Sequence, residues 1–148
     1  MPNCQCWPTR EPYSKLPEDD QNGRNCAGTR KLNKPEKEFH QPAGEWHPSG
    51  PKKNGIWEQK LAQDLGNGDA TLLQRYEAGA ATPPETIAHE YWEEVMILSG
   101  ELTDLGLGRT FTAGMYACRP PGMKHGPYRS GSGCSMLVFI RYALETAS

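Results

Sequence analysis

HEYWE at residues 89–93 and GMYACRPPGMKH at residues 114–125 are the two stretches that decide how this chain folds. In an extended strand, alternate side chains point to the same face, so His89 and Glu93 share one face. The second stretch contains a Pro-Pro-Gly turn, which ends one strand and returns the chain beside it, so the imidazole of His125 can approach the same face. Two imidazoles and a carboxylate that converge in this way predict a metal site inside a small β-barrel.

The spacing within the second stretch resembles one of the two signature motifs of the cupin superfamily. Gly114, Pro120, Gly122 and His125 stand at the family spacing, and Arg129 takes the place of the usual terminal asparagine. Because both glycines, the Pro-x-Gly turn and the histidine agree together, this resemblance is specific.

The first stretch resembles the other cupin motif in part. Counting back from Gly100, six residues separate it from Glu93, and three more separate Glu93 from His89, as in the family. The first histidine of the family's His-x-His pair would stand at position 87, where this chain has Ile87. The resemblance therefore implies three protein ligands for a metal, His89, Glu93 and His125, in place of four.

The resemblance covers roughly residues 56–142 and implies an all-β fold, the double-stranded β-helix or jelly-roll barrel of cupins. The residue pattern agrees, because short β-prone runs alternate with turn residues such as Gly66-Asn67-Gly68-Asp69 and Leu105-Gly106-Leu107-Gly108. We expect strands at residues 56–61, 70–77, 86–90, 94–98, 101–104, 109–112, 115–119 and 135–142. An eight-stranded jelly roll leaves an open mouth, which suits a ligand cavity.

The first fifty or so residues have a different texture. They are rich in proline and charge and show neither helical nor strand periodicity. We expect residues 1–51 to form an irregular N-terminal arm and residues 52–148 to form a single cupin domain. Trp7, His40 and Trp46 could anchor the arm on the barrel or on a second subunit, and disorder of the whole arm is the alternative.

Composition excludes several classes of function. Sixteen basic and 18 acidic residues give a formal net charge of −2, with no continuous basic face for nucleic acid or for a membrane surface. The longest strongly apolar run, residues 136–140, is far shorter than a membrane span of about 20 residues, and the N-terminus lacks the apolar stretch of a signal peptide. We therefore expect a cytoplasmic protein without nucleic-acid or membrane partners.

The five cysteines are an odd number for a disulfide framework, and we expect them to be reduced. Cys118 and Cys134 lie in predicted strands, where we expect buried free thiols that behave as small apolar side chains. Cys4, Cys6 and Cys26 match no common zinc pattern.

Two segments, residues 93–102 and 119–128, look like the branch of the cupins that contains the cupin half of ChrR-type anti-sigma factors and small acetylacetone and dihydroxyacetophenone dioxygenases. This resemblance implies a metal-dependent homodimeric enzyme that acts on a small carbonyl or phenolic compound. A dioxygenase is the first hypothesis for its reaction. A redox-neutral lyase or isomerase, such as a decarboxylase or dehydratase, is the second hypothesis. A non-enzymatic cupin that senses a ligand or a metal is the third, although residues 1–51 lack the His-x3-Cys-x2-Cys pattern of the anti-sigma zinc domain.

Two histidines and one carboxylate leave coordination positions open, as in the facial triad of non-heme Fe(II) oxygenases. Nitrogen and oxygen donors without thiolate suit Fe(II), Zn, Mn or Ni, and the dioxygenase resemblance puts Fe(II) first. A cupin that binds no metal is the alternative, because the first histidine of the motif is missing. Glu85 and Glu90 are nearby carboxylates, but strand alternation points Glu90 outward.

Tyr91 shares the face of His89, where its phenol could meet a substrate or simply pack. Arg75, Arg119 and Arg129 are candidates for binding a substrate carboxylate or enolate, because a guanidinium offers several donors and keeps its charge. Arg129 is the first choice because it occupies the usual asparagine position of the second motif, just past His125. A surface or rim position is the alternative for each arginine.

Overall fold

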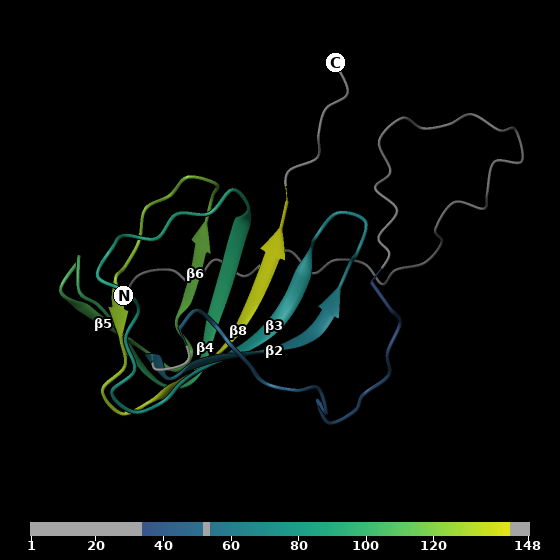
Figure 1. Cartoon of the computed structure of the whole chain (residues 1–148), viewed down its shortest axis with the longest axis horizontal. Helices are drawn as coiled ribbons and strands as arrows, with labels where there is room; N and C mark the ends of the chain where they lie inside the picture. The colour runs from purple at the N-terminus through teal and green to yellow at the C-terminus, as the bar shows by residue number, and fades with distance from the viewer. Residues whose placement is uncertain (1–33, 52–53, 143–148) are drawn as a thin grey trace, which may run out of the picture. The chain divides into compact units, whose positions relative to one another are not determined.

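The computed structural model describes residues 34–51 and 54–142 (Figure 1). These residues form eight strands: β1 (His47–Pro48), β2 (Ile56–Gln63), β3 (Ala70–Tyr76), β4 (Trp92–Asp104), β5 (Arg109–Thr112), β6 (Tyr116–Arg119), β7 (Tyr128–Arg129) and β8 (Cys134–Arg141). Every pairing between these strands is antiparallel, and the described residues contain no α-helix. The prediction of an all-β fold is confirmed.

The strands follow the order β1-β2-β3-β8-β4-β5, and β6 and β7 also pair with β4. In Figure 1, β2, β3, β8, β4 and β6 lie side by side in one curved sheet. The long strand β4 belongs to both halves of the barrel, because its first half pairs with β6 and β8 while its last residues pair with β5 and β7. This curl produces the predicted jelly roll and leaves an interior between the two halves.

Gly100 lets β4 pass from one half to the other without a break. The register of β4 against β8 shifts between Ile97 and Ser99, and Gly100 has a φ of 75°. A Cβ atom at this position would lie 2.0 Å from the carbonyl oxygen of Gly133, so only glycine fits. The two strands predicted at 94–98 and 101–104 are therefore one strand, because a bulge and one left-handed residue absorb the bend.

The strand predicted at residues 86–90 does not form. This segment pairs only through a single bridge between Ile87 and His125. Pro83 and Pro84 stand just before it and lack a backbone N–H, so the bridge cannot grow into a ladder through these two positions. Two short strands that the pattern did not predict, β1 and β7, are present, and the remaining strands form within a few residues of their predicted bounds.

Two buried aspartates hold the predicted hairpin turns. The Asp64 carboxylate accepts a hydrogen bond from the backbone N–H of Gly66 at 2.8 Å, in the turn between β2 and β3. Asp104 accepts one from the backbone N–H of Leu107 at 2.9 Å, in the turn between β4 and β5. Both carboxylates are buried and both act as local turn caps, which is the usual role of aspartate in such loops.

The core lies between the two halves of the barrel, on the inward faces of the strands. It is made of buried apolar residues, chiefly Ile56, Leu72, Tyr76, Val95, Ile97, Leu102, Tyr128, Met136 and Val138. Cys134 joins this core, as predicted, and burial raises the pKa of its thiol to about 11. The prediction for Cys118 is wrong: it is exposed, because it stands opposite Glu94 on the outer face of the sheet.

Residues 34–51, the described part of the predicted arm, contact the barrel. Strand β1 pairs with β2, and the ring of Trp46 lies 4.8 Å from the guanidinium carbon of Arg75 on β3. Lys34 Nζ donates a hydrogen bond to Thr71 Oγ1 at 3.1 Å. Trp46 is thus an anchor, while Trp7 lies outside the described residues. Within those residues there is no helix that is long and apolar enough to cross a membrane.

Candidate metal centre

Three backbone hydrogen bonds hold the segments that carry the two inward histidines. Ile87 and His125 exchange N–H···O bonds of 2.9 and 3.0 Å, and the N–H of Gly122 donates to the carbonyl of His89 at 2.8 Å. Gly122 has a φ of 78°, so the Pro-Pro-Gly turn delivers this N–H in a conformation that favours glycine. The second motif therefore fixes the position of His89 as well as that of His125.

Glu93 enters from β4 and lies between the two imidazoles. Its Oε1 is 3.7 Å from Nε2 of His89, and its Oε2 is 3.9 Å from Nε2 of His125. One donor atom from each of the three side chains lies within 4.8 Å of the others. Within residues 34–51 and 54–142 this is the one cluster of three or more metal-ligating side chains at such distances.

His125 is the most informative member of the cluster. Its side chain is only 6% exposed, and neither ring nitrogen has a hydrogen-bond partner among the described residues. Burial, and then the nearby Arg119 charge, lower the pKa of His125 to about 4, so the imidazole is neutral and offers a lone pair. Because a buried polar group without a partner is costly, a ligand that binds these ring nitrogens would stabilise the folded protein.

The donor set fits a divalent metal. Two neutral imidazoles and one carboxylate are the ligands of Zn sites and of the Fe(II) facial triad, and Mn and Ni also accept them. No thiol joins the cluster, since Cys118 faces outward. The carboxylates at Glu85 and Glu90 are exposed and stand outside it.

Tyr91 lies where alternation predicts, on the side of His89. The two rings stack with centroids 4.6 Å apart and an interplanar angle of 11°. Burial, and then the charge of Glu93, raise the pKa of Tyr91 to about 12, so the phenol keeps its proton and remains a hydrogen-bond donor.

Arg75 and Arg129 are not brought to the cluster. Arg75 stands between inward Gln74 and inward Tyr76 on β3, so it points outward and stacks on Trp46. Arg129 follows buried Tyr128 on β7 and is exposed for the same reason. Strand alternation, the rule that predicted the positions of Glu93 and Tyr91, excludes both arginines from the interior.

Arg119 is the arginine that lies inside. It stands opposite Glu93 in the register of β6 against β4, so the two side chains share the inward face. Its Nη1 donates to Glu93 Oε2 at 2.5 Å, and its Nη2 donates to the hydroxyl of Tyr128 at 2.9 Å. Burial raises the pKa of Tyr128 to about 12, so this hydroxyl also keeps its proton.

Glu58 is a residue of this interior that the sequence reasoning missed. Its Oε1 accepts hydrogen bonds from Ser49 Oγ at 2.7 Å and from Gln74 Nε2 at 2.9 Å. It lines the same cavity as His89. A signal was present, because Glu58 stands two positions after buried Ile56 and so falls on the inward face of β2.

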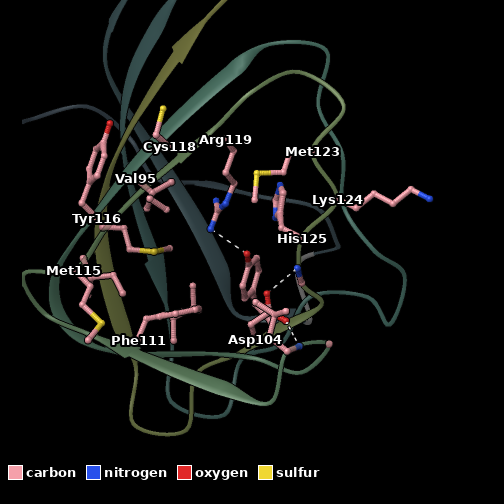
Figure 2. Close-up of a pocket in the computed structure, with 18 of the residues that line it drawn as sticks. Val95, Asp104, Phe111, Met115, Tyr116, Cys118, Arg119, Met123, Lys124 and His125 are labelled. Carbon is pink, nitrogen blue, oxygen red and sulfur yellow. Dashed lines mark hydrogen bonds between the residues drawn. The ribbon is translucent and has the colours of Figure 1, made fainter.

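Two cavities in the described part of the chain border the donor cluster. The smaller, about 300 Å³, is lined by His89, Tyr91 and Glu93 among others. The larger, about 490 Å³ and drawn in Figure 2, lies toward β5 and β6. Arg119, His125 and Tyr128 line both.

The family described as the ChrR cupin-like domain matches residues 34–143, which is most of the chain. The match spans the whole described barrel and all three clustered donors. The chain belongs to this family. No protein with a curated description matches this cupin.

Several solved cupins share the fold. An RmlC-like cupin from Shewanella frigidimarina has a TM-score of 0.59 and 20% identity, over 76% of this chain and 96% of that one. A candidate acetylacetone dioxygenase from Methylibium petroleiphilum has a TM-score of 0.58 and 17% identity, over 76% and 85%. The anti-sigma factor ChrR of Rhodobacter sphaeroides, solved with SigE, has a TM-score of 0.50 and 20% identity, over 64% of this cupin and 47% of that chain.

These identities establish the fold of this cupin and leave its activity open. The cupin spans about half the length of ChrR, and the similar structures include both a candidate enzyme and a regulator. The chemistry of this chain must therefore be argued from its own interior.

Proposed function

We propose that this cupin is a metal-dependent enzyme that acts on a small carbonyl or phenolic compound, with dioxygenase chemistry. The observation that carries the proposal is the His89–Glu93–His125 cluster, in which a buried, neutral and unpartnered imidazole faces a carboxylate and a second imidazole. The buried imidazole of His125 is costly without a ligand, and the donor set as a whole fits a divalent cation.

The three clustered side chains would hold the metal. When bound, a divalent metal supplies a Lewis acid that polarises a carbonyl oxygen, and Fe(II) adds redox chemistry with dioxygen. Arg119 lies beside Glu93 and supplies a fixed positive charge near any substrate oxygen that becomes negative. Tyr91, protonated and stacked on His89, supplies a hydrogen-bond donor in the same cavity.

Two observations support dioxygenase chemistry and Fe(II). The 2-His-1-carboxylate set is the one used by non-heme Fe(II) oxygenases. A candidate acetylacetone dioxygenase shares the fold of this cupin, and residues 93–102 and 119–128 resemble that branch. A β-diketone is a suitable first substrate, because its two oxygens can chelate a metal that keeps open positions.

A redox-neutral lyase or isomerase is the second candidate, and Glu58 is the observation that favours it. This carboxylate lines the cavity of the donor cluster, where it could move a proton on a bound substrate. A dioxygenase consumes one dioxygen for each substrate cleaved, whereas a lyase or isomerase converts substrate without oxygen uptake.

The test is an oxygen-electrode assay of full-length protein that has been stripped of metal and reloaded anaerobically with Fe(II), Zn, Mn or Ni. Acetylacetone and a panel of hydroxyaryl ketones serve as substrates. We expect oxygen uptake with Fe(II) alone and its loss in His125→Ala, while Arg129→Ala, an exposed position, serves as the control variant. Substrate turnover without oxygen uptake favours the lyase, and tight metal binding without any turnover favours a sensing cupin.

A further inference from the structure

Six residues line both cavities of the barrel interior: the apolar Val95, Leu102 and Met136, and the polar Arg119, His125 and Tyr128. The three polar side chains are called the wall below. The hydrogen bond from Arg119 to the Tyr128 hydroxyl, drawn in Figure 2, ties the wall together. His89 and Glu93 lie on the side of the smaller cavity, while the larger cavity lies on the side of β5 and β6. The donor cluster and the larger space thus meet at this wall.

The larger cavity is apolar away from the wall. The residues that line this cavity and not the smaller one include apolar side chains from five segments, chiefly Ile97, Leu107, Phe111, Met115 and Met123. Asp104 also lines it, but its carboxylate already accepts hydrogen bonds from two backbone N–H groups. A volume of about 490 Å³ falls within the range of small-molecule sites, roughly 300 to 1,000 Å³.

The wall still has capacity to bind an oxygen atom. A guanidinium carries five N–H donors, and the two hydrogen bonds that Arg119 makes to described residues use two of them. Both ring nitrogens of His125 lack a hydrogen-bond partner among the described residues. The larger cavity therefore has a polar end at Arg119 and His125 and an apolar body opposite.

We propose that the larger cavity binds the apolar body of an amphipathic substrate whose oxygen-bearing head lies at the Arg119–His125 wall. The class is an aryl- or branched-alkyl-substituted ketone or diketone, and a smaller compound such as acetylacetone binds more weakly. Naming this ligand a substrate rests on the proposed function, but its binding in the cavity does not require metal or turnover.

The test compares two probes, acetylacetone and 1-phenyl-1,3-butanedione, which differ by a phenyl group in place of a methyl group. Binding to metal-stripped full-length protein is measured by ligand-observed NMR titration. Burial of the phenyl ring in the cavity should tighten binding about tenfold or more. Equal dissociation constants for the two probes would overturn the proposal.

A cavity-filling variant locates the effect. Ala117 on β6 stands opposite buried Val95, points inward and lines only the larger cavity. Ala117→Phe should reduce the preference for the phenyl probe to about threefold or less and leave acetylacetone binding unchanged. The matched control is Ala113→Phe at an exposed turn position, which should keep the preference.

A second variant keeps the test decisive if Ala117→Phe does not fold. Leu107→Trp fills the same cavity from the exposed turn between β4 and β5, where no strand packing is disturbed. If both filled variants fold, as judged by circular dichroism, and both keep the tenfold preference, the proposal is wrong. Failure to bind metal or to turn over substrate would contradict only the proposed function. The preference for the phenyl probe is measured without metal and without turnover, so it tests the further proposal separately.

Discussion

Replacing Arg119 with methionine should lower the free energy of unfolding of the metal-free protein. The same substitution should raise its affinity for a divalent metal. Arg119 and Glu93 form an ion pair in which each side chain is only 13% exposed. Removing one partner of a buried pair leaves the other charge uncompensated, at a cost of about 3 kcal/mol or more. For a domain of this size that loss corresponds to a fall in Tm of roughly 10 °C.

A bound metal changes this cost, because its charge compensates Glu93 in place of the guanidinium. The metal-loaded variant should then lose chiefly the Arg119 hydrogen bond to Tyr128, about 1 kcal/mol. The difference between the two losses, about 2 kcal/mol, must appear as tighter metal binding, by roughly 30-fold. A substitution beside the site is thus expected to raise metal affinity.

The assay is urea unfolding of wild type and Arg119→Met, each stripped with EDTA and each loaded with Zn, together with calorimetric titration of the metal. Arg119→Lys keeps the charge and should show a smaller change in both quantities. Equal destabilisation of Arg119→Met with and without metal, or weaker metal binding by this variant, would refute the reasoning.

Other predictions concern single positions. Ile87→His should raise metal affinity by at least about tenfold, since this side chain lines the donor cavity, and Ile87→Val should leave the affinity unchanged in the same calorimetric titration. Gly100→Ala should cost more than about 3 kcal/mol in urea unfolding, because its Cβ meets a carbonyl oxygen. Gly114→Ala, where φ is also positive but space is open, should cost only about 1 kcal/mol. Iodoacetamide at about pH 8, followed by peptide mass spectrometry, should label exposed Cys118 and spare Cys134. The Cys134 thiol, whose pKa is raised to about 11, stays mostly protonated below that pH. Raising the pH to about 9.5 should therefore not make Cys134 react with iodoacetamide.

The parts of the site that follow local rules could be read from the sequence. Motif spacing and strand alternation placed Glu93 and Tyr91 on the inward face, and the structure brings His89, Glu93 and His125 together. The turn chemistry of the second motif likewise predicted how His125 returns to the interior. These features depend on residues close in sequence, where two-residue periodicity and glycine conformations decide the outcome.

The parts that depend on pairing between distant strands could not be read in the same way. Arg119 was one of three arginine candidates, and only its register against Glu93 shows that it faces inward. Arg129 was preferred because it occupies the asparagine position of the motif, although alternation from buried Tyr128 turns it outward. Register is set by tertiary packing, and a shift of one residue exchanges the two faces of a strand.

The most direct test of the account is the metal content of tag-free wild type beside His89→Ala, Glu93→Gln and His125→Ala. Each protein is loaded anaerobically with Fe(II), desalted and measured by inductively coupled plasma mass spectrometry, with circular dichroism to confirm the fold. The account predicts close to one metal for each wild-type chain and a large loss in every variant. A wild type that retains no metal, or a His125→Ala variant that retains as much as wild type, would contradict it.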